Sequence, residues 1–338
     1  MIWLTWRQFR TQALIGAAVT VAVAAVFLAT RGSLLALARD MGYTGCTADC
    51  DKLAQQFARQ AQSQIYGRLL FNGDALLFLL PALIGLFWGA PLVARELETG
   101  THRLVWNQTV SRGRWLAVKL GAIGLATVAV AGLLSWAITA WASPLDKANG
   151  WIVPETFTAR GVVPIGYAAF AFMAGVTIGM LMRRTVPAMA VTLVVVAAAM
   201  ALSIVVLRPH LVAQSTYTGA LTADKVGGIS LSINDPARRI RVEASAPVNN
   251  AWVLSNDVVT AAGAPWAGPY DPAKCGPQAP SGPQSCEQWI ASQNLKQKVI
   301  YLGPEKFWPL QWRELGVFLV VSALLAAFCF WWIRRRVA

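Results

Sequence analysis

Charged residues are scarce in this chain of 338 residues. Only 13% of its residues are Asp, Glu, Lys or Arg, whereas 56% are hydrophobic, and ordinary soluble domains carry about a quarter charged residues. This composition excludes an ordinary soluble protein and indicates a membrane protein. The net charge of +13 could also indicate nucleic-acid binding, and the distribution of that charge along the chain decides between the two.

The sequence also lacks the motifs of common catalytic centres. It contains no G-x-x-x-x-G-K-[ST] phosphate-binding loop, no H-E-x-x-H and no G-x-S-x-G. Its only histidines, His102 and His210, fall on opposite sides of the membrane in the topology predicted below, so they cannot share a site. We therefore expect no catalytic residue, no cofactor and no metal in this chain.

Six apolar runs are long enough to cross a bilayer core, which needs about 20 helical residues. They predict an all-α polytopic membrane protein with six transmembrane helices. A domain boundary is expected on each side of residues 208–313, the one long segment outside these runs. The predicted spans are Ala13–Thr30, Ala75–Ala94, Trp115–Ala142, Gly161–Met182, Val186–Leu207 and Glu314–Ile333.

Ionisable side chains are almost absent from the interiors of these spans. Tyr167 lies inside one, whereas Lys119 and Glu314 lie near span ends, where long side chains reach the interface at low cost. Ion-coupled transport normally uses buried Asp, Glu, His or Arg. The sequence therefore predicts that any transport is energised from outside this chain, and it disfavours an intramembrane enzyme.

Positive charge is concentrated in segments that would share one side of the membrane. Segments 1–12, 94–119, 183–185 and 334–338 together hold 12 Lys/Arg residues against only Glu96 and Glu98. The much longer segments on the other side are nearly balanced in charge. This positive-inside bias predicts that both termini are cytoplasmic, and it makes nucleic acid the weaker hypothesis.

The first twelve residues, MIWLTWRQFRTQ, place Ile2, Trp6, Phe9 and Ala13 on one helical stripe. Tryptophan and arginine suit the headgroup region of a bilayer. We predict an interfacial amphipathic helix over residues 1–12, followed by the first span. A signal peptide is the alternative, but its apolar core would exceed the usual 7–15 residues. The residues expected at the interface are Trp3, Trp6, Arg7 and Arg10.

Four of the five cysteines fall on the predicted outer side, and Cys329 lies in the last span. Paired cysteines are typical of an oxidising compartment. Four cysteines allow three connectivities, and we favour the local pairs Cys46–Cys50 and Cys275–Cys286. Zinc is the alternative, and no histidine lies near either pair.

The remaining outer segments carry weaker signals. In 31–74, Leu53, Phe57 and Ile65 suggest a helical piece. In the extracytoplasmic domain 208–313, alternation at Ile240 and Val242 and the run AWVLSNDVV suggest one or two strands. The segment WIASQNLKQKVIYL, residues 289–302, is predicted to be a helix leading back to the bilayer.

The inner segment 94–119, ARELETGTHRLVWNQTVSRGRWLAVK, is unusually elaborate for a loop between two spans. The second span is expected to end near residues 95–98, Gly100 permits a turn, and Thr101 could cap a short helix with an apolar face. Ser111 is predicted to cap the third span. A solvated loop without function is the alternative, but such a loop rarely exposes Leu-Val-Trp.

Several stretches resemble the type-2 ABC transporter permeases. The pattern Glu96-x-x-x-Gly100-Thr101-x-x-Leu104, followed by Ser111-Arg112 and Lys119, resembles the coupling segment of that family. The runs WLTWRQFR at 3–10, C-x-x-W-x-x-x-x-N-L-x-Q-x-V-x-Y at 286–301 and FWPLQWRE at 307–314 resemble an actinobacterial exporter branch. Gln108-Thr109 depart from the family, where a proline often follows the coupling helix.

This resemblance implies a non-catalytic permease subunit that is docked by a cytosolic ABC ATPase. ATP and Mg would be bound by that partner, and a second copy or a sister permease would complete the pore along spans two and five. The spacing Gly175-x-x-x-Gly179 suits either close helix packing within one chain or contact between helices of two chains. The residues expected to transmit the ATPase stroke are Glu96, Glu98, Gly100, Thr101, Arg103, Leu104, Trp106, Arg112 and Arg114.

We therefore predict an exporter permease for an amphipathic or apolar compound in the cell membrane. The alternative is a membrane sensor or assembly protein whose domain 208–313 binds a ligand and relays it to a cytosolic partner. Membrane lipids are expected around the chain in either case.

Overall fold

The computed structural model describes residues 2–47, 50–100, 111–231, 239–246, 248–276, 279–280 and 283–335. The chain divides into two compact units. We call Met1–Leu211 with Phe307–Ala338 the membrane unit, and Val212–Lys306 the insert unit.

The membrane unit is built from long apolar helices. In the described part of the chain, six helical stretches are long and apolar enough to cross a bilayer, so the prediction of six spans is confirmed. Most of them extend beyond the apolar runs because polar residues continue each helix past the bilayer core. The stretches are Phe9–Asp40, Ile65–Glu98, Arg112–Asn149, Val163–Met182, Thr185–Leu211 and Pro304–Arg335.

The first helix, α1, runs without interruption from Ile2 to Asp40. The predicted interfacial segment 1–12 is therefore the beginning of the first span's helix and not a separate element. No glycine or proline lies between residues 2 and 15 to break the helix. Two short elements follow, η1 (Tyr43–Gly45) and α2 (Cys50–Gln62), and α2 corresponds to the helical piece predicted in the first outer segment.

The second and fifth spans each contain a π-helical turn. In the second span, α3 (Ile65–Ile84) passes through the π turn η2 (Gly85–Gly89) into α4 (Ala90–Glu98). In the fifth span, α9 (Thr185–Leu202) passes through η3 (Ser203–Leu207) into α10 (Arg208–Leu211). Such turns occur mostly as single bulges and frequently at functional sites.

The fourth span, α8 (Val163–Met182), lies at the centre of the membrane unit, with 72% of its most apolar window buried. It packs against α3, α4, α6, α9 and α13. Its glycines allow backbone contact, because a Cβ at Gly175 would lie 2.5 Å from the carbonyl oxygen of Gly85 and one at Gly179 would lie 2.4 Å from that of Ala90. These glycines therefore serve close packing between helices of one chain.

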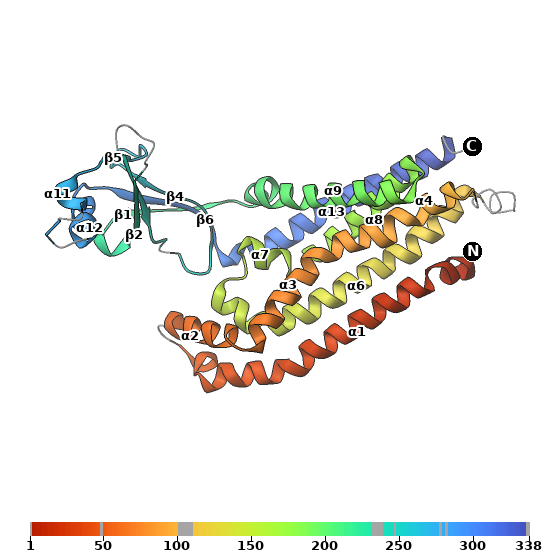
Figure 1. Cartoon of the computed structure of the whole chain (residues 1–338), viewed down its shortest axis with the longest axis horizontal. Coiled ribbons are helices and arrows are strands. Elements are labelled where there is room, and N and C mark those ends of the chain that lie inside the picture. The colour runs from red at the N-terminus through yellow and green to blue at the C-terminus, as the bar shows by residue number, and fades with distance from the viewer. Residues whose placement is uncertain are drawn as a thin grey trace. The chain divides into compact units, whose positions relative to one another are not determined.

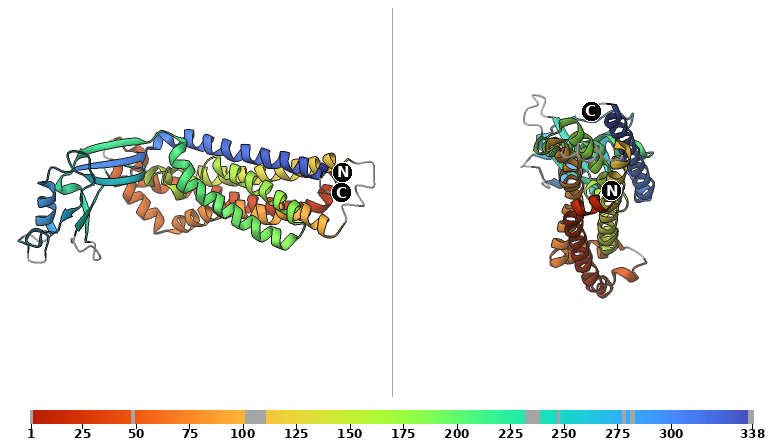
Figure 2. Two further views of the ribbon diagram at one scale, coloured as in Figure 1. Left: turned by 90° about the horizontal axis from the view of Figure 1, so that it is seen from above. Right: turned by 90° about the vertical axis from the view of Figure 1, so that its right-hand side faces the viewer.

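Helix α1 and the last helix, α13 (Phe307–Arg335), lie on opposite sides of the bundle (Figures 1 and 2). The start of α1, the end of α4, the α8–α9 turn and the end of α13 lie at the same end (Figure 1), which we call the α4 end. Helix α6 (Arg112–Asn149) also starts there. The short helix α7 (Pro154–Thr158) and α2 lie at the opposite end, the α7 end.

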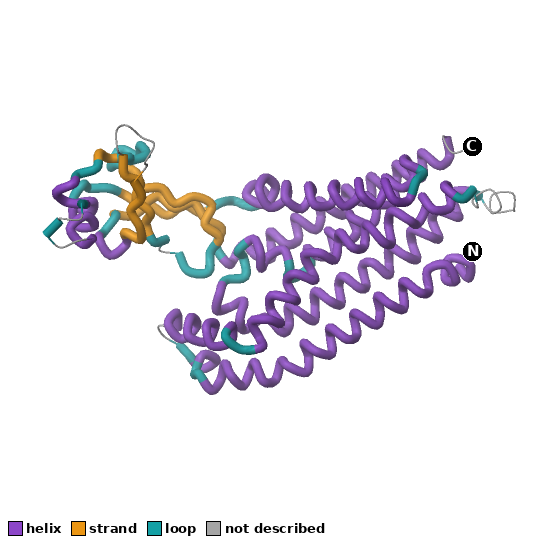
Figure 3. The backbone as a smooth tube through the Cα atoms, viewed as in Figure 1, coloured by secondary structure: helices purple, strands orange, loops and turns teal. Residues whose placement is uncertain are grey.

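The insert unit contains all the strands of the described chain (Figure 3). Two antiparallel three-stranded sheets have the orders β1-β6-β4 and β2-β3-β5. The all-α class thus holds for the membrane unit, and the insert unit adds strands to it. The elements are β1 (Ser215–Ala220), η4 (Ala223–Lys225), β2 (Val226–Leu231), β3 (Arg239–Ala244), β4 (Trp252–Val259), β5 (Gly268–Pro269), α11 (Pro272–Cys275), α12 (Pro283–Ala291), β6 (Lys296–Leu302) and η5 (Pro304–Lys306).

The predicted helix over residues 289–302 is wrong for its second half. Helix α12 ends at Ala291, and the residues from Lys296 to Leu302 form β6, the central strand of its sheet. The burial of Gln297 and Val299, two residues apart, is typical of a strand and not of a helix, because alternate side chains of a strand face the same side. The strands suggested at Ile240 and in AWVLSNDVV are β3 and β4.

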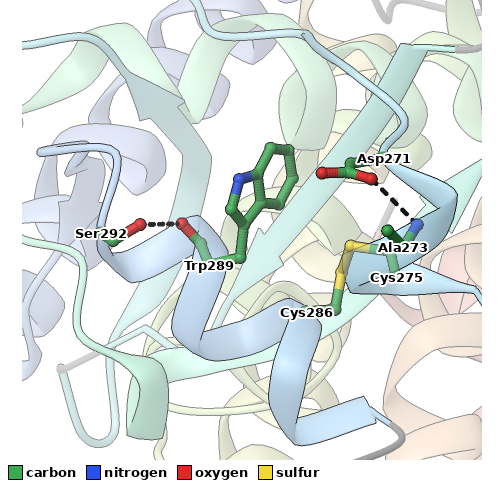
Figure 4. Close-up of a disulfide and its surroundings, with 6 residues drawn as sticks. All are labelled: Asp271, Ala273, Cys275, Cys286, Trp289 and Ser292. Carbon is green, nitrogen blue, oxygen red and sulfur yellow. Dashed lines mark hydrogen bonds between the residues drawn. A yellow bond between two sulfur atoms is a disulfide. The ribbon is translucent and has the colours of Figure 1, made fainter. Parts of the chain in front are cut away.

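The insert unit has its own core, which the predicted disulfide helps to form. Cys275 of α11 is bonded to Cys286 of α12, and Trp289 lies beside this bond (Figure 4). The side chain of Asp271 caps α11 by accepting from the amide of Ala273 at 2.9 Å. Residues from both sheets and from α12 complete the core: Leu221, Ile240, Val242, Ala244, Val258, Cys286, Ile290 and Leu295.

Candidate functional site

The predicted coupling segment begins where the second span ends. Helix α4 stops at Glu98, and both the amide and the hydroxyl of Thr99 donate to the carbonyl oxygen of Arg95, at 3.0 and 2.9 Å. Gly100 follows with φ 71°, in the left-handed region that suits glycine after a helix. The turn predicted at Gly100 is therefore present. Four expected coupling residues, Thr101, Arg103, Leu104 and Trp106, lie outside the described residues.

The third span begins at the residue predicted from its capping signal. Ser111 is the N-cap of α6, and its hydroxyl accepts a long hydrogen bond of 3.4 Å from the amide of Arg114. Arg112 is half-buried and the side chain of Arg114 is exposed. Arg114 is thus accessible at the α4 end.

Glu96 contacts the third span within the same chain. Its carboxylate lies 2.5 Å from the ammonium nitrogen of Lys119, and the two side chains are 13% and 4% exposed. The ammonium of Lys119 also lies 4.8 Å from the centre of the Trp115 ring. Glu96 therefore positions α4 against α6.

Glu98 contacts the start of the fifth span. Its carboxylate accepts from the amide of Thr185 at 3.0 Å and from the hydroxyl of Thr185 at 2.7 Å. The first amides of a helix have no partner within the helix, and a negative charge is favourable there. The end of α4 is thereby connected to α6 through Glu96 and to α9 through Glu98.

The residues predicted for the interface occupy the first turns of α1. Trp3 and Trp6 are 67% and 54% exposed, and the guanidinium of Arg7 lies 5.3 Å from the Trp3 ring. Phe9 is buried and packs edge-to-face on Trp88 at 5.1 Å. The predicted stripe is therefore divided, since Phe9 faces the bundle while Trp6 faces outward. Arg10 is exposed.

The structure also contains buried charges that the sequence analysis did not identify. Arg208 and Glu314 are fully buried, and Arg208 Nε lies 3.0 Å from Glu314 Oε2. The expectation that Glu314 reaches the interface is therefore wrong. Its carboxylate also accepts from the hydroxyls of Tyr167 and Ser203, because a buried carboxylate requires partners in place of water.

A second buried cluster surrounds Arg160. Its guanidinium Nε lies 2.6 Å from Asp146, and a further nitrogen of the same group bonds Asp74. Burial alone would lower the pKa of Arg160, but the charges of Asp146 and then Asp74 raise it above the ordinary value, so the group stays charged. The cluster connects α3, α6 and the segment before α8.

The signal for both clusters was present at the edges of the predicted spans. Asp74, Arg160 and Arg208 each lie one residue outside a predicted span, and Glu314 is the first residue of another. Acids and bases thus both lay at the edges of predicted spans at the same end of the bundle. Pairing them required the helix order in space, which the sequence did not provide.

The cysteines lie where the local pairing predicted. Cys46 is bonded to Cys50 and Cys275 to Cys286, while Cys329 is buried in α13 beside the Thr177 hydroxyl at 3.3 Å. In the described residues no group of three or more His, Cys, Asp or Glu side chains could hold a metal ion.

The six long apolar helices define a multi-pass membrane protein. The family model of ABC-2 membrane transporter related proteins matches residues 17–208, more than half of the chain. The chain belongs to this family, whose members are type-2 ABC permeases and are not themselves catalytic. No match was found among curated proteins or among solved structures.

Proposed function

We propose that this chain is the permease subunit of an ATP-driven exporter that moves an amphipathic or apolar compound out of the cell. A separate cytosolic ATPase would bind ATP and Mg and would dock on segment 94–114. The observation that carries this proposal is the pair of contacts made by Glu96 and Glu98. A displacement applied at the end of α4 would reach the third and fifth spans through them.

The buried charges support this energy source over ion-coupled transport. Arg208 faces Glu314, and Arg160 faces two carboxylates. Charges that are paired at such short distances stabilise the fold, and they are poorly suited to bind and release a transported ion.

The charge distribution supports a cytoplasmic α4 end with both termini on that side. Segments rich in Lys and Arg begin or end there, and the insert unit, with its disulfide, would then be extracytoplasmic. Cysteines introduced at Arg184 and Thr218, both exposed, test this topology on intact cells with a membrane-impermeant maleimide. Only Thr218→Cys should react, and labelling of Arg184→Cys would refute the orientation.

The family relationship supports pairing with a second copy or a sister permease. Gly175 and Gly179 are engaged within the chain, so this contact would use other residues. The outward face of the fifth span is available for it, because Val186 and Val194 of α9 and Val205 of η3 are 67–75% exposed.

Reconstitution with the ATPase tests the coupling proposal. A candidate ATPase is one with a P-loop that is encoded beside this chain or co-purifies with it. Glu98→Ala removes the contact with Thr185 while α4 and α9 remain intact, and we expect substrate-stimulated ATP hydrolysis to fall. Glu305→Ala, which removes an exposed carboxylate of the insert unit, is the matched control. Wild-type hydrolysis and transport in Glu98→Ala would contradict the proposed route.

A sensor or assembly function is the second candidate, because the insert unit is a compact unit with its own core. In that case the co-purifying partner would respond to an extracytoplasmic ligand without moving it. Transport of a compound by vesicles that contain the chain and its ATPase would exclude this alternative.

A further inference from the structure

Two cavities lie beside α1 in the membrane unit, one at the α4 end and the other towards the middle of the bundle. One, of about 450 Å³, contains charged groups, and the other, of about 340 Å³, is almost entirely apolar. Both volumes fall within the range of about 300–1,000 Å³ that is usual for small-molecule sites. We call them the polar cavity and the apolar cavity.

The two cavities adjoin, because Gln12, Phe87 and Trp88 line both of them. Gln12 Nε2 donates to the carbonyl oxygen of Phe87 at 3.3 Å, which connects α1 to the π turn η2. The Trp88 ring packs on α1, because it lies edge-to-face with Phe9 at 5.1 Å and a Cβ at Gly16 would lie 2.9 Å from it. A single molecule could therefore extend past Trp88 from one cavity into the other.

The apolar cavity faces outward from the bundle. Helices α1 and α3 form its sides and α6 forms its floor through Val130 and Leu134. Ile15, Val19 and Leu83 line it and are 44–61% exposed, which in a membrane-spanning helix means exposure to lipid. The Thr20 hydroxyl donates to the carbonyl oxygen of Gly16, so it does not need a hydrogen-bond acceptor from a molecule in the cavity. An acyl chain fits such a surface.

The polar cavity carries an excess of positive charge. Arg95, Glu96 and Lys119 line it, and the last two neutralise each other at 2.5 Å. Among the residues that the structure describes, no carboxylate lies within ion-pair distance of the Arg95 guanidinium. Arginine forms bidentate hydrogen bonds with carboxylate and phosphate groups, so this cavity favours an anionic headgroup.

We propose that the two cavities together bind one anionic amphiphile taken from the bilayer, with its headgroup at Arg95 and its acyl chain between α1 and α3. The apolar cavity selects a molecule that resides in the membrane, and the polar cavity selects one with a negative headgroup. This inference rests on the proposed function only in naming the bound amphiphile as the class of compound transported.

Photolabelling tests the site in the absence of any ATPase, so its outcome is independent of the coupling experiment. The full chain is placed in nanodiscs of zwitterionic lipid and labelled with lysophosphatidic acid that carries a diazirine near the end of its acyl chain. A monoacylglycerol with the same chain is the uncharged probe. We expect the charged probe to label peptides of α1 and α3 at about tenfold lower concentration, which corresponds to ~1.4 kcal/mol.

Matched variants separate the two cavities. Leu83→Trp should fill the apolar cavity and abolish labelling, whereas Leu79→Trp, on the same helix and also exposed but outside the cavity, should not. Arg95→Gln should reduce labelling by the charged probe to the level of the uncharged one, and Arg184→Gln should leave it unchanged. Equal labelling by both probes in the wild type, or labelling that persists in Leu83→Trp, would overturn the proposal. Competition by inorganic phosphate alone that displaces the label would show a soluble anion site and would overturn it as well.

Discussion

At the α7 end of the membrane unit Arg208 and Glu314 have no exposed surface, whereas at the α4 end Glu96 keeps 13% of its side chain exposed and Glu98 is exposed. Charges at the first end each have several partners and are enclosed by α8, α10 and α13. Among the residues described at the second end, Glu96 pairs with Lys119 and Glu98 accepts from Thr185, and neither glutamate is fully buried. Separating charges costs much more free energy where water cannot replace the partner. We therefore expect the contacts at the α4 end to change at lower cost than those at the α7 end.

The largest effect is expected from Glu314→Gln. This change leaves the Arg208 guanidinium buried without a counter-charge, which should lower the free energy of unfolding by about 3–5 kcal/mol. Thermal unfolding of the purified protein in detergent measures it. The double variant Arg208→Met with Glu314→Met should lose much less, since apolar residues often replace a buried ion pair at little cost. An equal loss in the double variant would contradict the account of this end.

A smaller effect is expected at Arg160, which has two carboxylate partners. Asp146→Asn should destabilise by about 2 kcal/mol, as for one charged hydrogen bond lost while a second remains. Asp74→Asn should cost less, because Asp74 is 28% exposed whereas Asp146 is 5% exposed. The same unfolding measurement compares the two variants. A larger loss for Asp74→Asn than for Asp146→Asn would show that burial of the carboxylate does not determine the loss.

Lys119→Met probes the α4 end at its most buried pair. We expect a loss of about 1–2 kcal/mol, because water can reach Glu96 once its partner is removed. The matched measurement is the rate of ATP hydrolysis by the reconstituted complex. This rate should fall by more than the loss of folded protein explains. A loss of stability as large as that of Glu314→Gln, with coupling preserved, would remove the distinction between the two ends.

The smallest effect on stability is expected from Arg114→Ala. Its side chain is exposed, so the free energy of unfolding should change by no more than about 0.5 kcal/mol. Binding of the ATPase to the chain in nanodiscs should nevertheless weaken if Arg114 contacts that partner. Unchanged binding would exclude Arg114 from the docking surface.

The sequence predicted the spans because apolar length alone determines them. It also predicted local features that depend on a few neighbouring residues, such as the turn at Gly100, the cap at Ser111 and the cysteine pairs. Glu96 and Glu98 were singled out as coupling residues, which stays a prediction, and their partners Lys119 and Thr185 belong to other spans. Such contacts depend on helix order in space, which no local pattern contains.

Two errors have the same physical origin. Residues 289–302 were taken as one helix because the segment is amphipathic, whereas the strand β6 is determined by its neighbours β1 and β4. Glu314 was taken as an interfacial residue because it lies at a span edge. It is instead buried against Arg208, which lies 106 residues earlier in the chain. In each case a distant segment overrides the local preference.

The π turn at Gly85–Gly89 also sets the angular phase of the second span. Successive residues of an α-helix are rotated by about 100°, so one extra residue in a turn rotates everything beyond it by that angle. The buried positions show this shift, because Ile84 and Gly85 are followed by Gly89 and Ala90 at a spacing wider than 3.6 residues. Deleting one residue within the turn would swing α4 around its axis and carry Glu96 and Glu98 away from Lys119 and Thr185. The direction in which the end of the second span points is thus set about two turns before that end.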